Sequence, residues 1–499
     1  MLGVAPLGLI FGPRQLNRFL PPSYATMSLN TRGIIMFATI NQFFTTFGAP
    51  VMVPVLLLII ARSLRVPWGQ AAQSALAAGV GLTGFSWLIS AFTPLVTKLI
   101  HQLVNSAGIQ RPVIDLGWQT GSLAAFSAPV GLAVFGFSLL LELLLFALGY
   151  TRIFMPANLW NNFGFMLWAT MAYTATHNLG LALGLAAFLI LMTLLLAEVQ
   201  APAWSTYYQV PHATVAAVHN IEQVVPILIL DPLFNRLGLD KCRFNPAHAQ
   251  AKLGALNEPM VLGALLGASL GILANFKRLT HLAAWGQISQ FTIQLAAIMA
   301  LFPLVTQVFA RAFAPLAAAI DRQPTPAKKR GPWFLAVDDG VGYGETTTLF
   351  TGMVLLPVLV LIAFGLPGNQ TLPVVDLIAL PFMIESIVAL TRGNFVKIVL
   401  TAVIWFSLGL YAASWLAPIY TATVAHYGTA LPAGVLLITS FNLVARPLNA
   451  LIFAAFISAN PLWIGLACGS YLIASVAFRR HRTQVWAYLA RQAARNQTA

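Results

Sequence analysis

The sequence predicts an all-α polytopic membrane protein, and composition and segment length carry this prediction. Hydrophobic residues make up 59% of the 499 positions and charged residues only 8%, too few to cover the surface of a soluble protein. Counting the apolar segments that approach the roughly 20 residues needed to span a bilayer gives about ten to twelve transmembrane helices. Such segments include residues 33–60, 124–148, 179–196, 260–274 and 395–416. Runs of this length exclude a transmembrane β-barrel, whose segments are short and alternating.

An internal duplication is predicted because three polar interruptions of the apolar runs occur twice, in the same order. The pairs are Gly48–Val53 with Leu256–Val261, Ile114–Gly117 with Val337–Gly340, and Thr176–Leu179 with Thr391–Phe395. Repeated Pro, Gly and acidic interruptions are typical of transporters built from two inverted repeats with discontinuous helices. We expect the first transmembrane repeat over residues 33–230 and the second over residues 257–478.

The remaining segments are expected to connect or flank the two repeats. Residues 1–32 are interpreted as an N-terminal arm without a convincing cleavage site. Residues 231–256 form a polar connecting segment, and residues 321–332 form a cytoplasmic loop with three prolines. Residues 479–499 are expected to be a basic cytoplasmic tail. No polar stretch is long enough to bury a core of its own, which excludes an ATPase or phosphocarrier domain within this sequence.

The net charge of +14 is interpreted as a membrane-topology signal and not as a sign of nucleic-acid binding. Much of the positive charge lies in Lys328-Lys329-Arg330 and in the five arginines of residues 479–495. Cytoplasmic loops carry such an excess of Lys and Arg and contact anionic lipid. The C-terminus is therefore predicted to be cytoplasmic.

The sequence lacks the motifs of hydrolytic, nucleotide-binding and metal-binding proteins. It contains no P-loop, nucleophile elbow or HExxH pattern. Its two cysteines, Cys242 and Cys468, belong to no CxxC or metal-like set. We therefore predict no catalytic residues, no metal and no cofactor.

Two glycine-rich acidic segments are candidates for a substrate site. Residues 337–345 (VDDGVGYGE) contain Asp339. Residues 115–121 (DLGWQTG) contain Asp115 and show the same combination of acidic residues and glycines in the other half. Glycine lets the backbone leave helical geometry, and inside a membrane protein such backbone persists only where it is buried or lines a wet cavity. A polyol can supply the missing hydrogen-bond partners. The alternative is an ordinary loop at the water interface.

Glu258 and His212 are further candidates, each with a structural alternative. Glu258 precedes Pro259 at the start of an apolar segment, so its carboxylate could face a ligand or cap the helix. His212 also opens an apolar segment, where an imidazole could bind hydroxyl groups, titrate near neutral pH or serve only packing.

At these residues the chain resembles the membrane subunit, enzyme IIC, of galactitol-type phosphotransferase system (PTS) permeases in the ascorbate–galactitol superfamily. The similar segments are Val113–Trp118 (VIDLGW), Val210–Thr214 (VPHAT), Phe234–Gly263, Leu366–Leu377 (LPGNQTLPVVDL), Arg392–Asn394 (RGN) and the basic end near Arg479. The resemblance covers roughly residues 49–480, nearly the whole chain.

The resemblance implies a multi-pass bacterial inner-membrane permease that forms a homodimer, with a substrate-carrying core domain and a dimerisation domain. It implies an elevator-type movement of the core and phosphorylation of a polyol or sugar by separate IIB and IIA proteins, so that the chain itself is not an enzyme. The substrate-binding residues that it implies are Asp115, Trp118, His212, Glu258 and Asp339. An aromatic face such as Trp118 could cover the C–H side of a sugar.

The chain departs from the family pattern at four positions, which are Gly164, Ala213, Asn257 and Thr391. Gly164 replaces a histidine that galactitol permeases carry after a Trp-Asn pair, which argues against galactitol itself as the substrate.

Two other functions are compatible with the same residues. Buried Asp339, Glu258 and His212 could form the proton relay of a secondary transporter driven by protons or sodium. The departures could also mark a structural or regulatory membrane protein that no longer transports.

Overall fold

The computed structural model describes residues 49–107, 112–242, 244, 246, 258–322, 332–427 and 437–496. The expected N-terminal arm, the basic triplet Lys328–Arg330 and much of the polar connecting segment lie outside these ranges. The described part of the chain contains six helices long and apolar enough to cross a membrane, together with three shorter apolar helices. The predicted all-α polytopic membrane fold is confirmed, and other apolar segments form shorter helices.

The first half begins with a helical hairpin and continues through short strands and helices. In chain order its elements are α2 (Ala49–Ser63), α3 (Trp68–Ala107), β1 (Val113–Asp115), α4 (Trp118–Ser127), α5 (Pro129–Ala147), β2 (Ile153–Phe154), η2 (Met155–Asn162), α6 (Phe163–Thr176), α7 (Leu179–Tyr207), β3 (Ala213–Val215), η3 (Ile221–Gln223), α8 (Val224–Arg236) and η4 (Leu239–Lys241).

The second half runs through a similar order of elements. They are α10 (Pro259–Ala274), η6 (Phe276–Arg278), α11 (Leu282–Arg311), α12 (Ala314–Asp321), β4 (Phe334–Val337), α14 (Gly340–Tyr343), α15 (Thr346–Gly365), β5 (Thr371–Leu372), η7 (Asp376–Ala379), α16 (Leu380–Thr391), α17 (Phe395–Tyr427), β6 (Leu437–Thr439), α18 (Phe441–Val444), α19 (Pro447–Ile457) and α20 (Pro461–Arg495). Several helices begin with proline at the first position, where the missing N–H costs no intrahelical hydrogen bond.

The strands form two small parallel sheets in which the two halves exchange strands. In one sheet β1 lies between β5 and β6, and in the other β4 lies between β2 and β3. Val113 pairs with Thr371 and Leu437, whereas Leu335 pairs with Phe154 and Ala213. Each central strand therefore comes from one half and both of its neighbours come from the other. This pairing gives hydrogen-bond partners to backbone N–H and C=O groups of the extended segments, which would otherwise be buried without partners.

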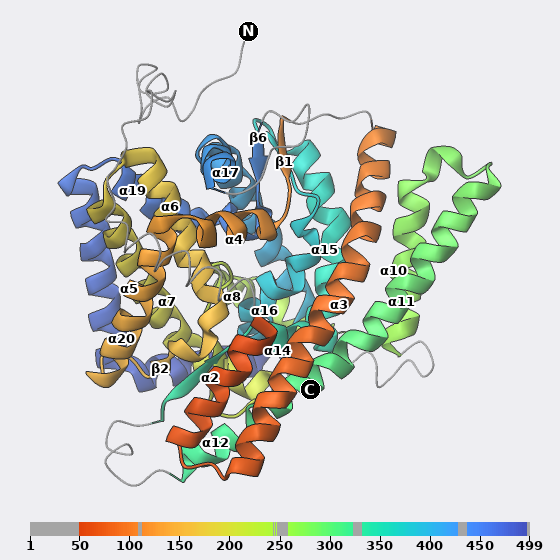
Figure 1. Cartoon of the computed structure of the whole chain (residues 1–499). Helices are drawn as coiled ribbons and strands as arrows, with labels where there is room; N and C mark the ends of the chain where they lie inside the picture. Colours follow the sequence, from red (N-terminus) through yellow and green to blue (C-terminus); the bar gives the residue numbers. More distant parts are fainter. Residues whose placement is uncertain are drawn as a thin grey trace.

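Corresponding elements of the two halves lie at opposite ends of the molecule. Strands β1 and β6 lie near the upper end in Figure 1, and β2 lies near the lower end. The turn between α2 and α3 is at the lower end, whereas the turn between α10 and α11 is at the upper end (Figure 1). The two hairpins thus point in opposite directions.

The third repeated sequence pair marks two equivalent helix ends. Helix α6 ends at Thr176 and α16 ends at Thr391, and each is followed by a residue with left-handed backbone, His177 and Arg392, both with φ of 51°. A left-handed residue after the last turn ends a helix and redirects the chain. In both halves a long helix, α7 or α17, follows directly.

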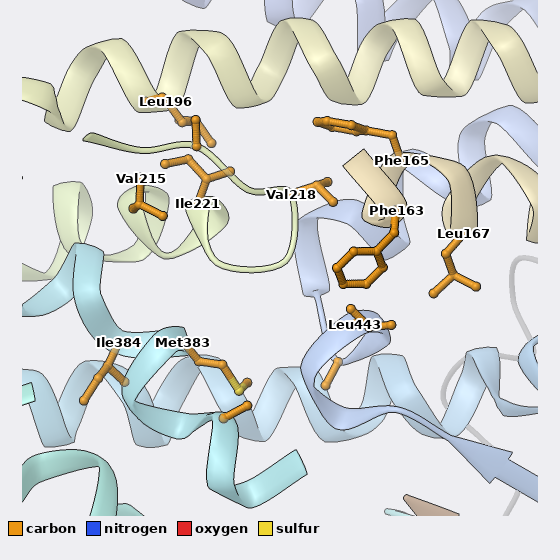
Figure 2. Packing of buried hydrophobic residues seen from close by; sticks show 14 of the residues in the cluster. Phe163, Phe165, Leu167, Leu196, Val215, Val218, Ile221, Met383, Ile384 and Leu443 are labelled. Atoms are coloured by element: carbon orange, nitrogen blue, oxygen red, sulfur yellow. The ribbon is translucent and has the colours of Figure 1, made fainter. Parts of the chain in front are cut away.

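The helices differ in how much of their surface is buried within the protein. In the most apolar 18-residue stretch of α7 and in that of α15, 56% of the residues are buried, compared with 17% in that of α20. Helices α7 and α15 therefore belong to the interior, and α20 presents large apolar side chains such as Leu466 and Ile473 on the outside. In the interior, the ring of Phe163 lies between Val218 and Leu443 (Figure 2), so α6 meets the segments that follow β3 and β6.

Close packing of α10 on α11 depends on three glycines spaced four residues apart. A Cβ atom added to Gly263 or Gly267 would lie 2.7 Å from Leu295 O or from Thr292 Cα, respectively, and one added to Gly271 would lie 3.2 Å from Ile288 Cα. Small residues at this spacing let two helix backbones approach closely in a membrane.

The expected basic tail is a helix in the structure. Helix α20 continues to Arg495, with one break in helical geometry at His481. Its end is held by Lys397, a completely buried residue of α17. The Lys397 ammonium donates to Asp231 and to Asn496, each at 2.7 Å, and also to Asn235. One buried cation thereby joins α8, α17 and the residue that follows α20.

We expect Lys397→Met to destabilise the protein by about 3 kcal/mol, because it leaves the buried Asp231 carboxylate without its counter-charge. Thermal unfolding of the detergent-purified protein, followed by size-exclusion chromatography, measures the change. Lys277→Met, at the turn between α10 and α11, is the control and should leave the unfolding temperature nearly unchanged. Equal unfolding temperatures for both variants would contradict the assigned role of Lys397.

Candidate functional site

Asp115 ends β1 and is completely buried. One carboxylate oxygen accepts backbone N–H groups from Gly117 at 3.0 Å and Phe441 at 3.2 Å. The other accepts from Val374 at 3.1 Å and Asp376 at 2.8 Å. Four backbone donors on one carboxylate favour a structural role over the substrate contact implied by the resemblance, and that contact remains a prediction.

Asp376, which the sequence analysis did not select, complements Asp115. Its carboxylate accepts the backbone N–H of Trp118 at 2.7 Å and that of Asn442 at 2.9 Å, and the Ser440 hydroxyl donates to it. Together the two carboxylates organise the chain after β1, β5 and β6, where α4, η7 and α18 begin. A signal for Asp376 exists in the sequence, since Val374-Val375-Asp376-Leu377 closely resembles Val113-Ile114-Asp115-Leu116.

Trp118 and Asp339 are connected by a row of rings. The ring centroid of Trp118 lies 5.9 Å from that of Phe163, and Phe163 stacks on His219 at 5.7 Å. Nε2 of His219 lies 3.1 Å from a carboxylate oxygen of Asp339, and the Asn220 amide donates to the same oxygen at 3.0 Å. Residues after β1, β3 and β4 therefore meet beside the start of α6.

Glu385 of α16 is a second residue that sequence reasoning missed. It is completely buried, and the indole N–H of Trp204 donates to its carboxylate at 3.3 Å. A Cβ added to Gly342 would overlap its carboxyl carbon, so the carboxylate packs directly on the turn that follows Asp338 and Asp339. A lone carboxylate within an apolar helix was the available signal.

We call His219, Asn220, Asp338, Asp339 and Glu385 the central polar cluster. Three of its buried atoms, Nδ1 of His219, Oδ1 of Asn220 and Oε1 of Glu385, have no hydrogen-bond partner within the described ranges. Their residues are only 3%, 1% and 0% exposed, respectively. Because buried polar atoms are nearly always paired, three unpaired atoms in this one cluster make it a candidate for binding a polar ligand.

His212 lies at the opposite end of β3 from His219. It has a left-handed backbone, with φ of 54°, and is half-buried. Its carbonyl accepts the backbone N–H of Leu335 at 2.7 Å, and its ring lies 6.2 Å from that of Phe334. These contacts place it at the start of the β3–β4 pairing, before the segment that contributes to the central polar cluster.

Glu258 is exposed and immediately precedes α10. Its backbone is extended, and its side chain makes no capping hydrogen bond to α10. Helix α10 stands at the right edge of Figure 1, away from α6 and α16. Of the five expected substrate contacts, the row of rings thus joins Trp118 to Asp339, and Asp376 connects Asp115 to the backbone of Trp118. The binding role of Glu258 remains a prediction.

Glu222 and Arg446 connect the segments that follow β3 and β6. The Glu222 carboxylate accepts the indole N–H of Trp405 at 2.9 Å and the backbone N–H groups of Leu448 and Asn449, each at 3.2 Å. Arg446, also completely buried, donates from Nε to the carbonyl of Asn442 at 2.7 Å. These bonds fix the start of α19 against the segment that carries His219 and Asn220.

Gly164 lies beside the same segment. A Cβ at this position would overlap a methyl group of Val218 and lie 3.7 Å from Nδ1 of His219. A histidine at position 164 would therefore require Val218 to move, and the imidazole of His219 already lies next to that position.

Gly342→Ala is expected to reduce substrate affinity about tenfold while leaving the protein folded. The new methyl group must displace the flexible carboxylate of Glu385, which would weaken the hydrogen bond between this carboxylate and the substrate. The loss of one such bond is worth about 1.4 kcal/mol. Titration of the purified protein with polyols measures the affinity. Gly136→Ala is the matched control, since nothing lies within 4 Å of its Cβ position. An unchanged affinity in Gly342→Ala would argue against Glu385 as a contact.

Comparison with known proteins agrees with this architecture. Residues 42–434 match the family described as the PTS system sugar-specific permease component. The chain is 24% identical to the PTS system galactitol-specific EIIC component of Escherichia coli strain K12 over 434 residues, which covers 85% of this chain and 92% of the relative. The corresponding component of Escherichia coli O157:H7 gives the same identity and coverage. The chain thus belongs to the family of sugar-specific permease components of the phosphotransferase system, multi-pass membrane transport subunits in which IIA and IIB partners carry out phosphoryl transfer.

Proposed function

We propose that the central polar cluster binds a polyol or related sugar and holds it for phosphorylation by a IIB protein. The observation that carries this proposal is the set of unpaired buried atoms on His219, Asn220 and Glu385. Hydroxyl groups both donate and accept hydrogen bonds, so a polyol can pair with carboxylate, amide and imidazole atoms together. The role of the protein is to position a hydroxyl group, since the phosphoryl group resides on the partner.

The aromatic residues next to the cluster suit the remaining surface of such a substrate. Trp118 and Phe163 lead away from His219 as a row of rings, and aromatic faces cover the C–H side of a sugar ring or polyol chain. Both relatives are named as galactitol-specific. We propose a hexitol as substrate, with His219 in place of the imidazole that Gly164 lacks.

We infer that the two halves are inverted repeats and that the core moves as an elevator. The exchanged strands support a rigid core, because each sheet joins segments of both halves. Four of the five cluster residues are buried and Asp338 is partly exposed, so a shift of the core relative to its surroundings would open the site to a solute. The α2–α3 and α10–α11 hairpins, which stand beside this core in Figure 1, are the elements against which it would move.

We propose that the hairpin of α10 and α11 also contributes to a homodimer. Its outer surface exposes large apolar side chains, including Leu265, Ile293 and Leu301. Cysteine pairs introduced along this surface should crosslink two subunits in native membranes. Crosslinking only along α20 would place the dimer interface elsewhere.

The proposed cytoplasmic face carries the C-terminus. The end of α20 exposes Arg480, Arg491 and Arg495, and Arg62 and Arg65 border the α2–α3 turn at the same end in Figure 1. The opposite turn, between α10 and α11, carries Lys277 and Arg278. The larger positive charge at the lower end supports a cytoplasmic assignment for that end, and IIB would dock there.

Uptake by membrane vesicles tests the proposed function. Hexitol accumulation should require phosphoenolpyruvate together with IIA and IIB, yield a phosphorylated product and stop when the residue of IIB that carries the phosphoryl group is replaced. The buried His219–Asp339 pair would also suit a proton-coupled transporter. Accumulation of unmodified substrate that a protonophore abolishes would support that second function and overturn the first.

A further inference from the structure

We propose that the central polar cluster is a charge filter, which accepts neutral and cationic hydroxylated solutes and rejects anionic ones, including the phosphate ester formed from its own substrate. This inference rests on the proposed function and specifies its substrate class.

The first argument is the concentration of carboxyl groups. Asp338 and Asp339 follow β4, and the Glu385 carboxylate packs on Gly342 a few residues further along. Asp339 binds His219, and one oxygen of Asp338 accepts the backbone N–H of Gly340 at 2.9 Å. Three carboxyl groups thus share the cluster with one imidazole.

The second argument concerns the positions of the basic side chains. Among the described residues, the ion pairs of lysine and arginine are those of Arg152 and Arg482 with Glu198 and of Lys397 with Asp231. None of these reaches the cluster, where His219 is the ion-pair partner. Among the described residues, no lysine or arginine forms an ion pair with the carboxyl groups of the cluster, so an anion bound there would be repelled by whichever of these groups is ionised.

The third argument is the type of the unpaired atoms. Oε1 of Glu385 is an acceptor, and so is Oδ1 of Asn220, because the amide nitrogen of Asn220 donates to Asp339. Both atoms require a donor from the ligand. Hydroxyl and ammonium groups provide donors, whereas a phosphate dianion or a carboxylate provides only acceptors.

Two other buried carboxylates, those of Asp115 and Glu222, lack this property. Asp115 accepts four backbone N–H groups, and Glu222 accepts two backbone N–H groups and one indole N–H. Their oxygens are occupied by the protein itself. Unlike them, the central polar cluster keeps acceptor atoms for the ligand, so a phosphate group placed against these atoms, where a hydroxyl group would lie in the substrate, would bind poorly.

The test is a charge series built on one carbon skeleton and measured on the full-length protein in detergent by isothermal titration. The probes are galactitol, 1-amino-1-deoxygalactitol, galactonate and galactitol 1-phosphate, with the mannitol series in parallel. We expect the neutral and amino compounds to bind with affinities within about threefold of each other or with the amine tighter. The carboxylate and phosphate should bind at least 30-fold more weakly, about 2 kcal/mol. Equal affinity for galactitol and its phosphate would overturn the charge filter while leaving the transport proposal intact.

Glu385→Gln provides the second measurement, because it preserves shape and removes one carboxylate. The ratio of neutral to phosphate affinity should fall at least fivefold in this variant. Asp240→Asn, outside the cluster, is the control and should keep the wild-type ratio. An unchanged ratio in Glu385→Gln would overturn the proposal. If no neutral hexitol binds and vesicles show no phosphoenolpyruvate-dependent uptake, the proposed function fails as well.

Discussion

Asp115→Ala is expected to cost at least about 4 kcal/mol of folding stability, a large part of what a protein of ordinary stability has. The substitution leaves four buried backbone N–H groups without their acceptor. It also disconnects β1 from the segments after β5 and β6. The amount of monodisperse protein in detergent extracts, before and after heating, measures the loss.

Asp115→Asn separates a structural role from a binding role. An amide keeps the shape of the side chain but directs N–H groups at two backbone donors, so this variant should also unfold at a clearly lower temperature. Asp240→Asn serves as the control and should behave as the wild type. An Asp115→Asn protein with unchanged unfolding temperature but no hexitol binding would instead support the contact that the resemblance implied.

Asp339→Asn is expected to weaken hexitol binding at least 30-fold, about 2 kcal/mol, while the protein remains inserted and folded. The carboxylate holds both His219 and Asn220, so its loss removes a charged acceptor and releases two other proposed contacts. Isothermal titration gives the affinity, and the unfolding temperature serves as the control for folding. Unchanged affinity in a folded Asp339→Asn protein would exclude Asp339 from the site.

The sequence predicted the fold class because hydropathy and segment length are local properties. It also indicated where regular helices end, since Gly117, Pro259 and the Thr-His and Thr-Arg pairs are visible along the chain. The small parallel sheets were not predicted. Strands of two to four residues are too short to show a period, and their partners lie in the other half of the chain.

The predicted substrate contacts overlap in part with the central polar cluster and its neighbouring rings, and their binding roles stay predictions. Trp118 and Asp339 lie in the region that the structure favours, and His219 and Asn220 were visible beside the VPHAT segment. His212 was selected in their place because it matched a family motif, although it lies at the other end of β3. Glu385 was missed because four apolar or small neighbours on each side make it resemble an isolated polar residue of a packed helix.

The sequence by itself determined that this chain crosses a membrane and that its helices are interrupted at corresponding places in two halves. Hydrophobic length and the backbone preferences of glycine and proline are sufficient for that. The tertiary structure decided which interruptions meet and which carboxylates remain available to a ligand. Backbone donors from the segments after β1, β5 and β6 converge on Asp115 and Asp376, whereas Asp339 and Glu385 accept fewer hydrogen bonds. That difference arises from contacts between residues hundreds of positions apart, which the packing of the two halves creates.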